Sequence, residues 1–137
     1  MSSTKFDPEK DIAPIPFNQE ICQLALEMKR SGLVWRPHVG CFAWDPDNYI
    51  KQASPFPNRI YFVLSMPRFL GIFGSTSNMI EKLVWLPTWH QARSICRQLE
   101  ITDDVIFNRL QQNLLLDDDL KNIYECICSA LKKMTIK

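Results

Sequence analysis

The chain has 137 residues, 46% of them hydrophobic and 23% charged, with a formal net charge of +1. This size and balance are typical of one globular domain whose core needs neither metal nor disulfides. The near-neutral charge disfavours nucleic-acid binding, and no run approaches the roughly 18 apolar residues that suggest a membrane span.

The cysteines and the first residues indicate a cytoplasmic protein. Residues 1–9 are polar and mixed in charge, without the apolar core of an export signal. The cysteines are odd in number and widely spaced: Cys22, Cys41, Cys96, Cys126 and Cys128. We therefore expect reduced thiols, no membrane association and no cofactor.

Residue types are distributed unevenly along the chain. All 9 prolines, 4 glycines and 4 tryptophans lie before position 91, and the only later phenylalanine is Phe107. Proline and glycine interrupt helices. We therefore predict an extended or disordered arm over 1–16 and a single domain over 17–137, with helix and sheet in 17–87 and only helices in 88–137.

The first half predicts one helix followed by short strands. Asn18 is a good N-cap and Gly32 a good C-terminal stop for the helix. Residues 65–68 resemble a hairpin turn between two of the apolar runs. The predicted strands cover 39–44, 59–65 and 69–73. Both faces of this sheet are largely apolar, so helices should cover at least one of them fully.

The next segment has two interpretations, and three helices are predicted after it. Residues 77–84 suit a short helix, whereas 83–86 suit a strand that extends the sheet. Thr88 and Gln91 form a capping box that begins the first C-terminal helix. The second is predicted to begin at Thr102 or Asp103, and the third in the acidic run 117–119.

These elements predict an α+β fold. A small antiparallel sheet of three to four strands is expected to pack against the N-terminal helix and the C-terminal group of three helices. The last helix carries an apolar stripe at helical spacing: Leu120, Ile123, Tyr124, Ile127, Leu131 and Met134. That stripe either closes the monomer's own core or forms a homodimer interface.

The aromatic residues are the first candidate site. An indole combines a large apolar face with one hydrogen-bond donor, so the tryptophans suit either a ligand wall or a core. All of them fall in or beside the predicted sheet: Trp35, Trp44, Trp85 and Trp89. The core interpretation is favoured, most clearly for Trp89.

The histidines are the second candidate site. His38 and His90 are able to act as acid–base groups, but no catalytic motif accompanies them, so a spectator role is favoured. Together with Cys41 and Cys96, the two histidines make four potential zinc ligands. His90 and Cys96 lie six apart on one predicted helix and point to different sides, so no metal site is expected.

Two loops resemble binding motifs only in part. Residues 71–78 are rich in glycine and hydroxyl groups but lack the lysine of a phosphate-binding loop, so they are interpreted as a structural junction. Asp45-Pro46-Asp47-Asn48 resembles the start of a calcium loop, yet Tyr49 and Ile50 follow where a ligand and a glycine are required. That segment is interpreted as a turn.

Two short motifs resemble a pattern in small bacterial and phage proteins. The first is L-x-W-x-P, here residues 33–37, followed by Gly40. The second is W-L-P-T-x-x-Q, here residues 85–91. No known activity is attached to that pattern, so the resemblance implies neither a site nor a reaction.

Three functions are carried forward. The first is a non-catalytic interaction or accessory domain that binds a protein partner through the 45–58 loop, Trp44 and Tyr49. The second is a small-molecule-binding domain or minor enzyme, with a pocket formed by Trp35, His38, Trp85 and His90. The third, which the charge disfavours, is nucleic-acid binding through Arg36, Arg59, Arg68, Arg93 and Arg97.

Overall fold

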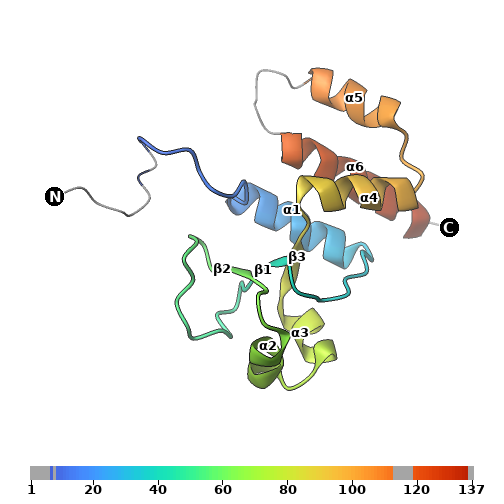
Figure 1. Ribbon diagram of the computed structural model, residues 1–137. Helices are drawn as coiled ribbons and strands as arrows, with labels where there is room; N and C mark the ends of the chain where they lie inside the picture. Colours follow the sequence, from blue (N-terminus) through green and yellow to red (C-terminus); the bar gives the residue numbers. More distant parts are fainter. Residues whose placement is uncertain (1–6, 8, 113–118, 136–137) are drawn as a thin grey trace.

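The structure, a computed structural model, describes residues 7, 9–112 and 119–135 (Figure 1). Within these residues the chain forms six helices and three strands. In chain order they are α1 (Gln19–Arg30), β1 (Phe42–Trp44), β2 (Ile60–Phe62), α2 (Met66–Phe73), α3 (Thr76–Lys82), β3 (Val84–Leu86), α4 (Trp89–Gln98), α5 (Asp103–Gln112) and α6 (Asp119–Thr135).

The strands form one antiparallel sheet in the order β2-β1-β3. Phe42 of the central strand lies opposite Phe62 and Leu86, and Trp44 lies opposite Ile60 and Val84. The predicted α+β class is confirmed, with an N-terminal helix, a small antiparallel sheet and C-terminal helices.

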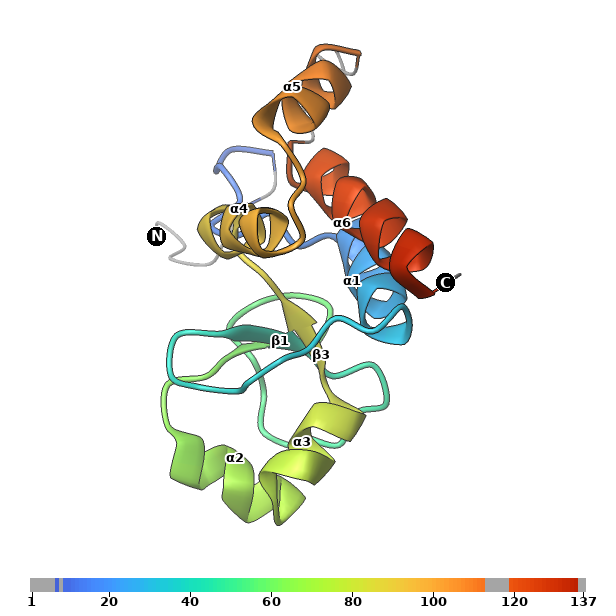
Figure 2. The same cartoon turned by 90° about the vertical axis from the view of Figure 1, so that its right-hand side faces the viewer.

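Each face of the sheet is covered by helices (Figures 1 and 2). The side with α1, α4, α5 and α6 is called the helical side, and the side with α2 and α3 the small side. On one face, the helical-side core joins Trp44, Ile60, Val84 and Leu86 to α1, α4, α5 and α6. The other face contributes Ala43 to the small-side core, whose buried members are Trp35, Cys41, Ala43, Ile50, Val63, Phe69, Phe73, Met79 and Leu83. Because successive side chains of a strand point to opposite faces of the sheet, even these three-residue strands contribute to two separate cores.

Local signals fix both ends of α1 as the sequence predicts. The Asn18 side chain accepts a hydrogen bond from the Ile21 N–H at 2.9 Å. At the other end Gly32 has φ +104°, and the Leu33 N–H donates to the Met28 carbonyl at 2.9 Å. This is a Schellman ending, which needs a residue in the left-handed region.

The predicted strand at 69–73 and its hairpin turn at 65–68 are wrong. The segment forms α2, with Ser65 as N-cap, Pro67 in the first turn and left-handed Gly74 (φ +84°) at the end. Phe69 and Phe73 lie one turn apart, and both are buried in the small-side core. Proline suits a first helical turn, and the i, i+4 phenylalanine pair decides the outcome over strand propensity.

The two interpretations of residues 77–86, a short helix and a strand, are each correct for part of the segment. α3 occupies Thr76–Lys82, and β3 follows at Val84–Leu86. Asn78 Nδ2 donates to the Phe73 carbonyl at 2.9 Å, which joins α3 to the end of α2. The helix and the strand thus share the segment rather than compete for it.

The C-terminal helices pack on one another and on α1. The capping box of α4 is confirmed by reciprocal hydrogen bonds between Thr88 and Gln91. Along α6, which packs against α1, α4 and α5, the buried stripe comprises Leu120, Ile123, Tyr124, Ile127 and Leu131. These residues belong to the chain's own core, whereas Met134 is 60% exposed. Residues 117 and 118 of the acidic run lie outside the described residues.

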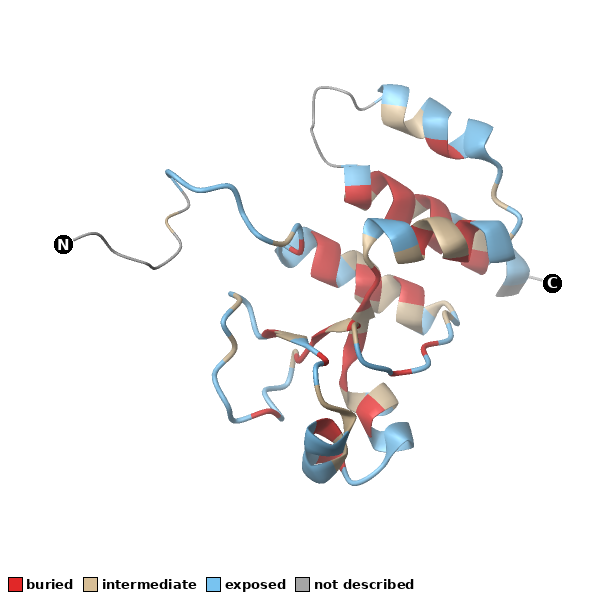
Figure 3. Cartoon of the chain, viewed as in Figure 1, coloured by how far each residue is buried: buried red, intermediate tan, exposed pale blue. Residues whose placement is uncertain are grey.

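Exposure differs among the helices (Figure 3). α5 buries only Ile106 and leaves Val105 and Phe107 exposed. No helix in the described part of the chain has the length and apolar character needed to cross a membrane.

Candidate functional site

A cleft of about 650 Å³ opens on the helical side of the molecule. Figure 2 shows the segments that supply it: the linker from α1 to β1, strand β3, α4 and α6. The lining residues are Gly32, Leu33, Val34, Arg36, His38, Trp85, His90, Gln91, Ser94, Ile95, Gln98, Leu99, Leu131 and Met134. The volume falls in the range typical of small-molecule sites.

One face of α4 forms a wall of this cleft. Gln91, Ser94, Ile95 and Gln98 recur at helical spacing and therefore lie on the same side of the helix. The Gln91 side chain is already used in the capping box, since its Oε1 accepts from the Thr88 N–H at 2.9 Å. Ser94 and Gln98 remain as the polar groups that this wall offers to a ligand.

The ionisable groups of the cleft are all basic. Arg36 and His38 come from the linker and His90 from the first turn of α4, and the described lining contains no carboxylate. His38 Nδ1 lies 2.8 Å from the Arg36 carbonyl oxygen, a contact that fixes the ring beside the cleft. The cleft therefore offers basic and apolar groups together.

The cysteines do not provide this cleft with a reactive thiolate. All five are free and buried, and none lines the cleft. Cys41 contacts a lining residue, with its Sγ 3.5 Å and 3.7 Å from the two ring nitrogens of His38, but it is fully buried. Burial raises the pKa of Cys22 to about 12 and the pKa values of Cys96 and Cys128 to about 11. Those three thiols are protonated at neutral pH.

Among the described residues, no group of three or more His, Cys, Asp or Glu side chains is arranged to hold a metal ion. Of the four candidate zinc ligands, Cys96 is buried in the helical-side core and Cys41 in the small-side core. His38 and His90 are both exposed. What the two histidines share is the cleft.

The structure brings together three of the six candidate site residues. His38, Trp85 and His90 line the cleft. Trp35 is buried in the small-side core, against which Trp85 also packs, and the two line a small cavity of about 30 Å³, room for a single water molecule. Trp44 is buried in the helical-side core. The core expectation is wrong for Trp89, which is 40% exposed on the first turn of α4.

Tyr49, the sixth candidate, lies on the small side of the sheet. It is 41% exposed, its ring centroid lies 6.3 Å from that of Phe73, and Lys82 Nζ stands 5.1 Å from the Tyr49 centroid. Trp44 and Tyr49 therefore do not share a surface. Of the two aromatic residues assigned to a protein-binding loop, only Tyr49 is accessible.

The turn at residues 45–48 depends on a buried carboxylate. Asp45 is fully buried, and its two oxygens accept hydrogen bonds from the Tyr49 N–H at 3.0 Å and the Ile50 N–H at 2.7 Å. Arg59 Nε donates to the Asp45 carbonyl at 2.9 Å. This aspartate organises the start of the 45–58 loop, and the calcium-loop comparison gave no indication of that role.

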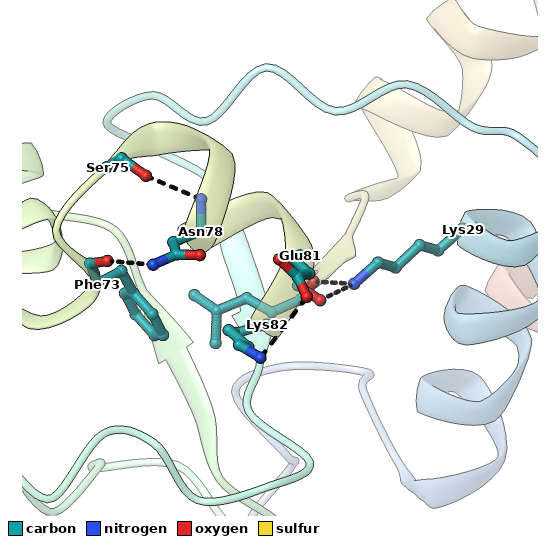
Figure 4. Close-up of polar contacts among 7 residues, drawn as sticks. Lys29, Phe73, Ser75, Asn78, Glu81 and Lys82 are labelled. Carbon is teal, nitrogen blue, oxygen red and sulfur yellow. Dashed lines mark hydrogen bonds and ion pairs between the residues drawn. The ribbon is translucent and has the colours of Figure 1, made fainter.

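The polar groups of residues 71–78 are used by the α2–α3 junction (Figure 4). The Ser75 Oγ accepts from the Asn78 N–H at 3.1 Å, and the Asn78 amide donates to Phe73. Gly74 supplies the left-handed ending of α2. These contacts give Gly74, Ser75 and Asn78 structural roles in the junction.

The arginines proposed for nucleic acid are dispersed. Arg59 is held by backbone carbonyls, and Arg93 pairs with Asp103 at 2.8 Å. Arg36 lines the cleft, whereas Arg68 lies at a separate groove beside β2. They do not form one continuous basic stripe.

That groove is the second accessible feature. It has a volume of about 270 Å³ and lies between β2, the loop at 50–53 and α2. Phe62 is 38% exposed, Leu64 74% and Ile72 39%. The groove lies at the β2 edge of the sheet, where Tyr61 packs against the small-side core and Phe62 contacts Phe42 on the helical face, and it shares no lining residue with the basic cleft.

Several cleft residues were not recognised as site residues from the sequence. Arg36 was considered only as a nucleic-acid contact, while Ser94, Gln98 and Leu131 were not considered as ligand contacts at all. The polar positions 91, 94 and 98 on one helical face were the available signal. Comparisons with protein-family models, curated proteins and solved structures gave no match to this chain.

Proposed function

We propose that this protein binds a small molecule in the cleft between the α1–β1 linker, β3, α4 and α6. The observation that carries the proposal is the convergence of His38, Trp85 and His90, which come from three separate segments, around one space of about 650 Å³. Ligand sites characteristically combine an apolar lining with a few polar groups from different elements.

Binding without catalysis is the function that the cleft residues support best. A catalytic histidine needs a nucleophile and usually an orienting carboxylate within hydrogen-bond reach. The described lining contains Ser94 but no carboxylate, and Cys41 is buried behind His38. The free cysteines of the chain agree with a location in the reducing cytoplasm.

A fragment screen by NMR tests the proposal. With four tryptophans and two histidines in the chain, the indole N–H and imidazole C–H signals are few enough to assign. Fragments that bind in the cleft should shift Trp85, His38 and His90 together and leave Trp44 in place.

Ser94→Trp is the variant that fills the cleft, because Ser94 lines it. Ser129→Trp is its matched control, since Ser129 is exposed on α6 and does not line the cleft. Shifts should disappear in Ser94→Trp and persist in Ser129→Trp. Shifts that survive in both variants, or an absence of hits in the wild type, would exclude a small-molecule site here.

A second candidate function is protein binding through the groove beside β2. The exposed Phe62, Leu64 and Ile72 beside an edge strand are the observation that favours it. Either a different protein or a second copy of the chain would bury these side chains.

Leu64→Asp tests this second function against Val105→Asp, which places the same charge on an exposed apolar residue of α5. Capture of a partner, or dimerisation in sedimentation equilibrium, should be lost in Leu64→Asp and kept in Val105→Asp. Equal behaviour of the two variants would remove the groove from consideration.

A further inference from the structure

We infer that the ligand of the cleft is a small organic anion, with a carboxylate at one end and an apolar body. This inference rests on the proposed small-molecule function and adds the chemical class of the ligand. It follows from the charges that line the cleft and from the residues that form its walls.

Arg36 is the group that selects an anion. Two other arginines of the helical side are already neutralised, since Arg93 pairs with Asp103 and Arg109 with Glu125. Arg36 is exposed, lines the cleft and forms no ion pair within the described residues. Its planar guanidinium presents a fork of N–H donors that matches the two oxygens of a carboxylate.

The two histidines extend the same preference. His38 and His90 line the cleft with Arg36. The Nδ1 N–H of His38 donates to the Arg36 carbonyl, so the imidazole that offers a ligand an N–H donor in either protonation state is that of His90. No described carboxylate lines the cleft to repel an anion or to attract a cation. A ligand amine would therefore meet basic groups without a counter-charge.

The apolar walls define the rest of the ligand. Trp85, Ile95 and Leu131 line the cleft from β3, α4 and α6, and the exposed Met134 adds a flexible edge. Such surfaces favour a ring system or a short acyl chain. A free metal ion or inorganic phosphate would leave these walls in water.

Three probes with one ring system but different charges test the inference: 2-naphthoate, 2-naphthamide and 2-naphthylmethylamine. Each is titrated into the full chain while the His38, His90 and Trp85 NMR signals are followed. The anion should bind at least about tenfold more tightly than the amide, the factor that corresponds to about 1.4 kcal/mol. The amine should bind most weakly. Octanoate, titrated in parallel, distinguishes a flexible acyl body from a flat ring.

Arg36→Gln should lower the affinity for 2-naphthoate by about tenfold and leave that for 2-naphthamide unchanged. Arg97→Gln is the matched control, because Arg97 is exposed on α4 but does not line the cleft. Unfolding midpoints of both variants show whether each remains folded.

Equal binding of the anion and the amide, with both sets of signals shifted, would overturn the anion inference while the cleft remains a binding site. Equal loss of anion affinity in Arg36→Gln and Arg97→Gln would also overturn it, because a general charge effect would then suffice. If no probe shifts the cleft signals at millimolar concentration and the fragment screen finds no hit, both the inference and the proposed function fail.

Discussion

The two sides of the sheet are built in different ways. The helical side uses long elements, 12 residues in α1 and 17 in α6, each with a continuous apolar stripe. The small side uses α2 and α3, of 8 and 7 residues, and the opposite face of three-residue strands. Helices this short are marginal alone. The small side therefore depends on contacts between segments, whereas the helical side follows from local periodicity.

The candidate surfaces follow the same division. The basic cleft lies on the helical side, and the apolar groove lies beside α2 at the β2 edge of the sheet. Lys29 connects the two sides, because its Nζ on α1 donates to the carbonyls of Glu81 (2.7 Å) and Leu83 (3.0 Å) at the end of α3 (Figure 4). Burial lowers the pKa of Lys29. These hydrogen bonds satisfy carbonyls that the end of α3 leaves without helical partners.

The largest effect is expected from Ile127→Ala in α6. Ile127 is fully buried in the helical-side core, so the free energy of unfolding should fall by about 2–5 kcal/mol. Urea unfolding followed by circular dichroism measures this loss. Ser129→Ala, an exposed change on the same helix, should cost less than about 0.5 kcal/mol. A small loss for Ile127→Ala would mean that α6 is not integral to the core.

Asp45→Ala should destabilise the small side by about 1–3 kcal/mol, because the N–H groups of Tyr49 and Ile50 lose their acceptors. Asp47→Ala, an exposed change in the same turn, is the control and should have little effect. Hydrogen exchange should show faster exchange at residues 45–50, with α6 less affected. Uniform acceleration over both sides would show that the two cores unfold as one unit.

How far the sequence predicted the fold depends on the side. Asn18, Gly32 and the Thr88–Gln91 pair specify helix ends through contacts within a few residues, and these predictions are confirmed. The run Phe69-Leu70-Gly71-Ile72-Phe73 fits either a strand or a helix by composition. Burial of Phe69 and Phe73 against Met79 and Val63 of the small-side core decides in favour of a helix. That is tertiary information, absent from a five-residue pattern.

The candidate site shows the same limit. His38, Trp85 and His90 could be selected as chemically interesting residue types, but nothing in their spacing states that they share a cleft. Arg36 is visible in the sequence as a charge, but whether an arginine forms an ion pair, as Arg93 does with Asp103, depends on where the carboxylates lie in the fold. Residue type was thus readable from the sequence, and proximity was not.

Alkaline pH should weaken the helical side through its buried thiols. Cys22 keeps its proton in the folded chain until about pH 12, whereas its ordinary pKa is 9.0. Above that ordinary value the unfolded state binds fewer protons than the folded state, so stability falls as pH rises. The loss approaches about 1.4 kcal/mol for one such thiol one unit above its ordinary pKa.

Cys22→Ala isolates this contribution. The variant should lose less stability than the wild type between neutral pH and about pH 10, by roughly the amount given for one thiol. Urea unfolding at both pH values measures the difference. Cys96 and Cys128, whose pKa values are also raised by burial, should leave the variant with part of the slope. Identical slopes in the two proteins would contradict the buried state of the Cys22 thiol.

The smallest change in stability is expected from substitutions of Gly71, where the sequence predicts a strand and the structure has the helix α2. Gly71 lies within α2, and a Cβ placed there meets no atom within 4 Å. Gly71→Ala should therefore raise the free energy of unfolding by about 0.5–1 kcal/mol. Gly71→Val should raise it less, because valine is a poorer helix former than alanine.

A strand would reverse that order, since valine is favoured over alanine in strands. Gly32→Ala supplies the opposite sign: a Cβ there is also free of contacts, but φ is +104°, so the change should cost about 1 kcal/mol. Denaturant midpoints of the three variants measure the order directly. An alanine variant more stable than the valine variant at Gly71 would support the helix α2, and the reverse order would support a strand there. A loss of stability in Gly32→Ala would show separately that the end of α1 needs glycine.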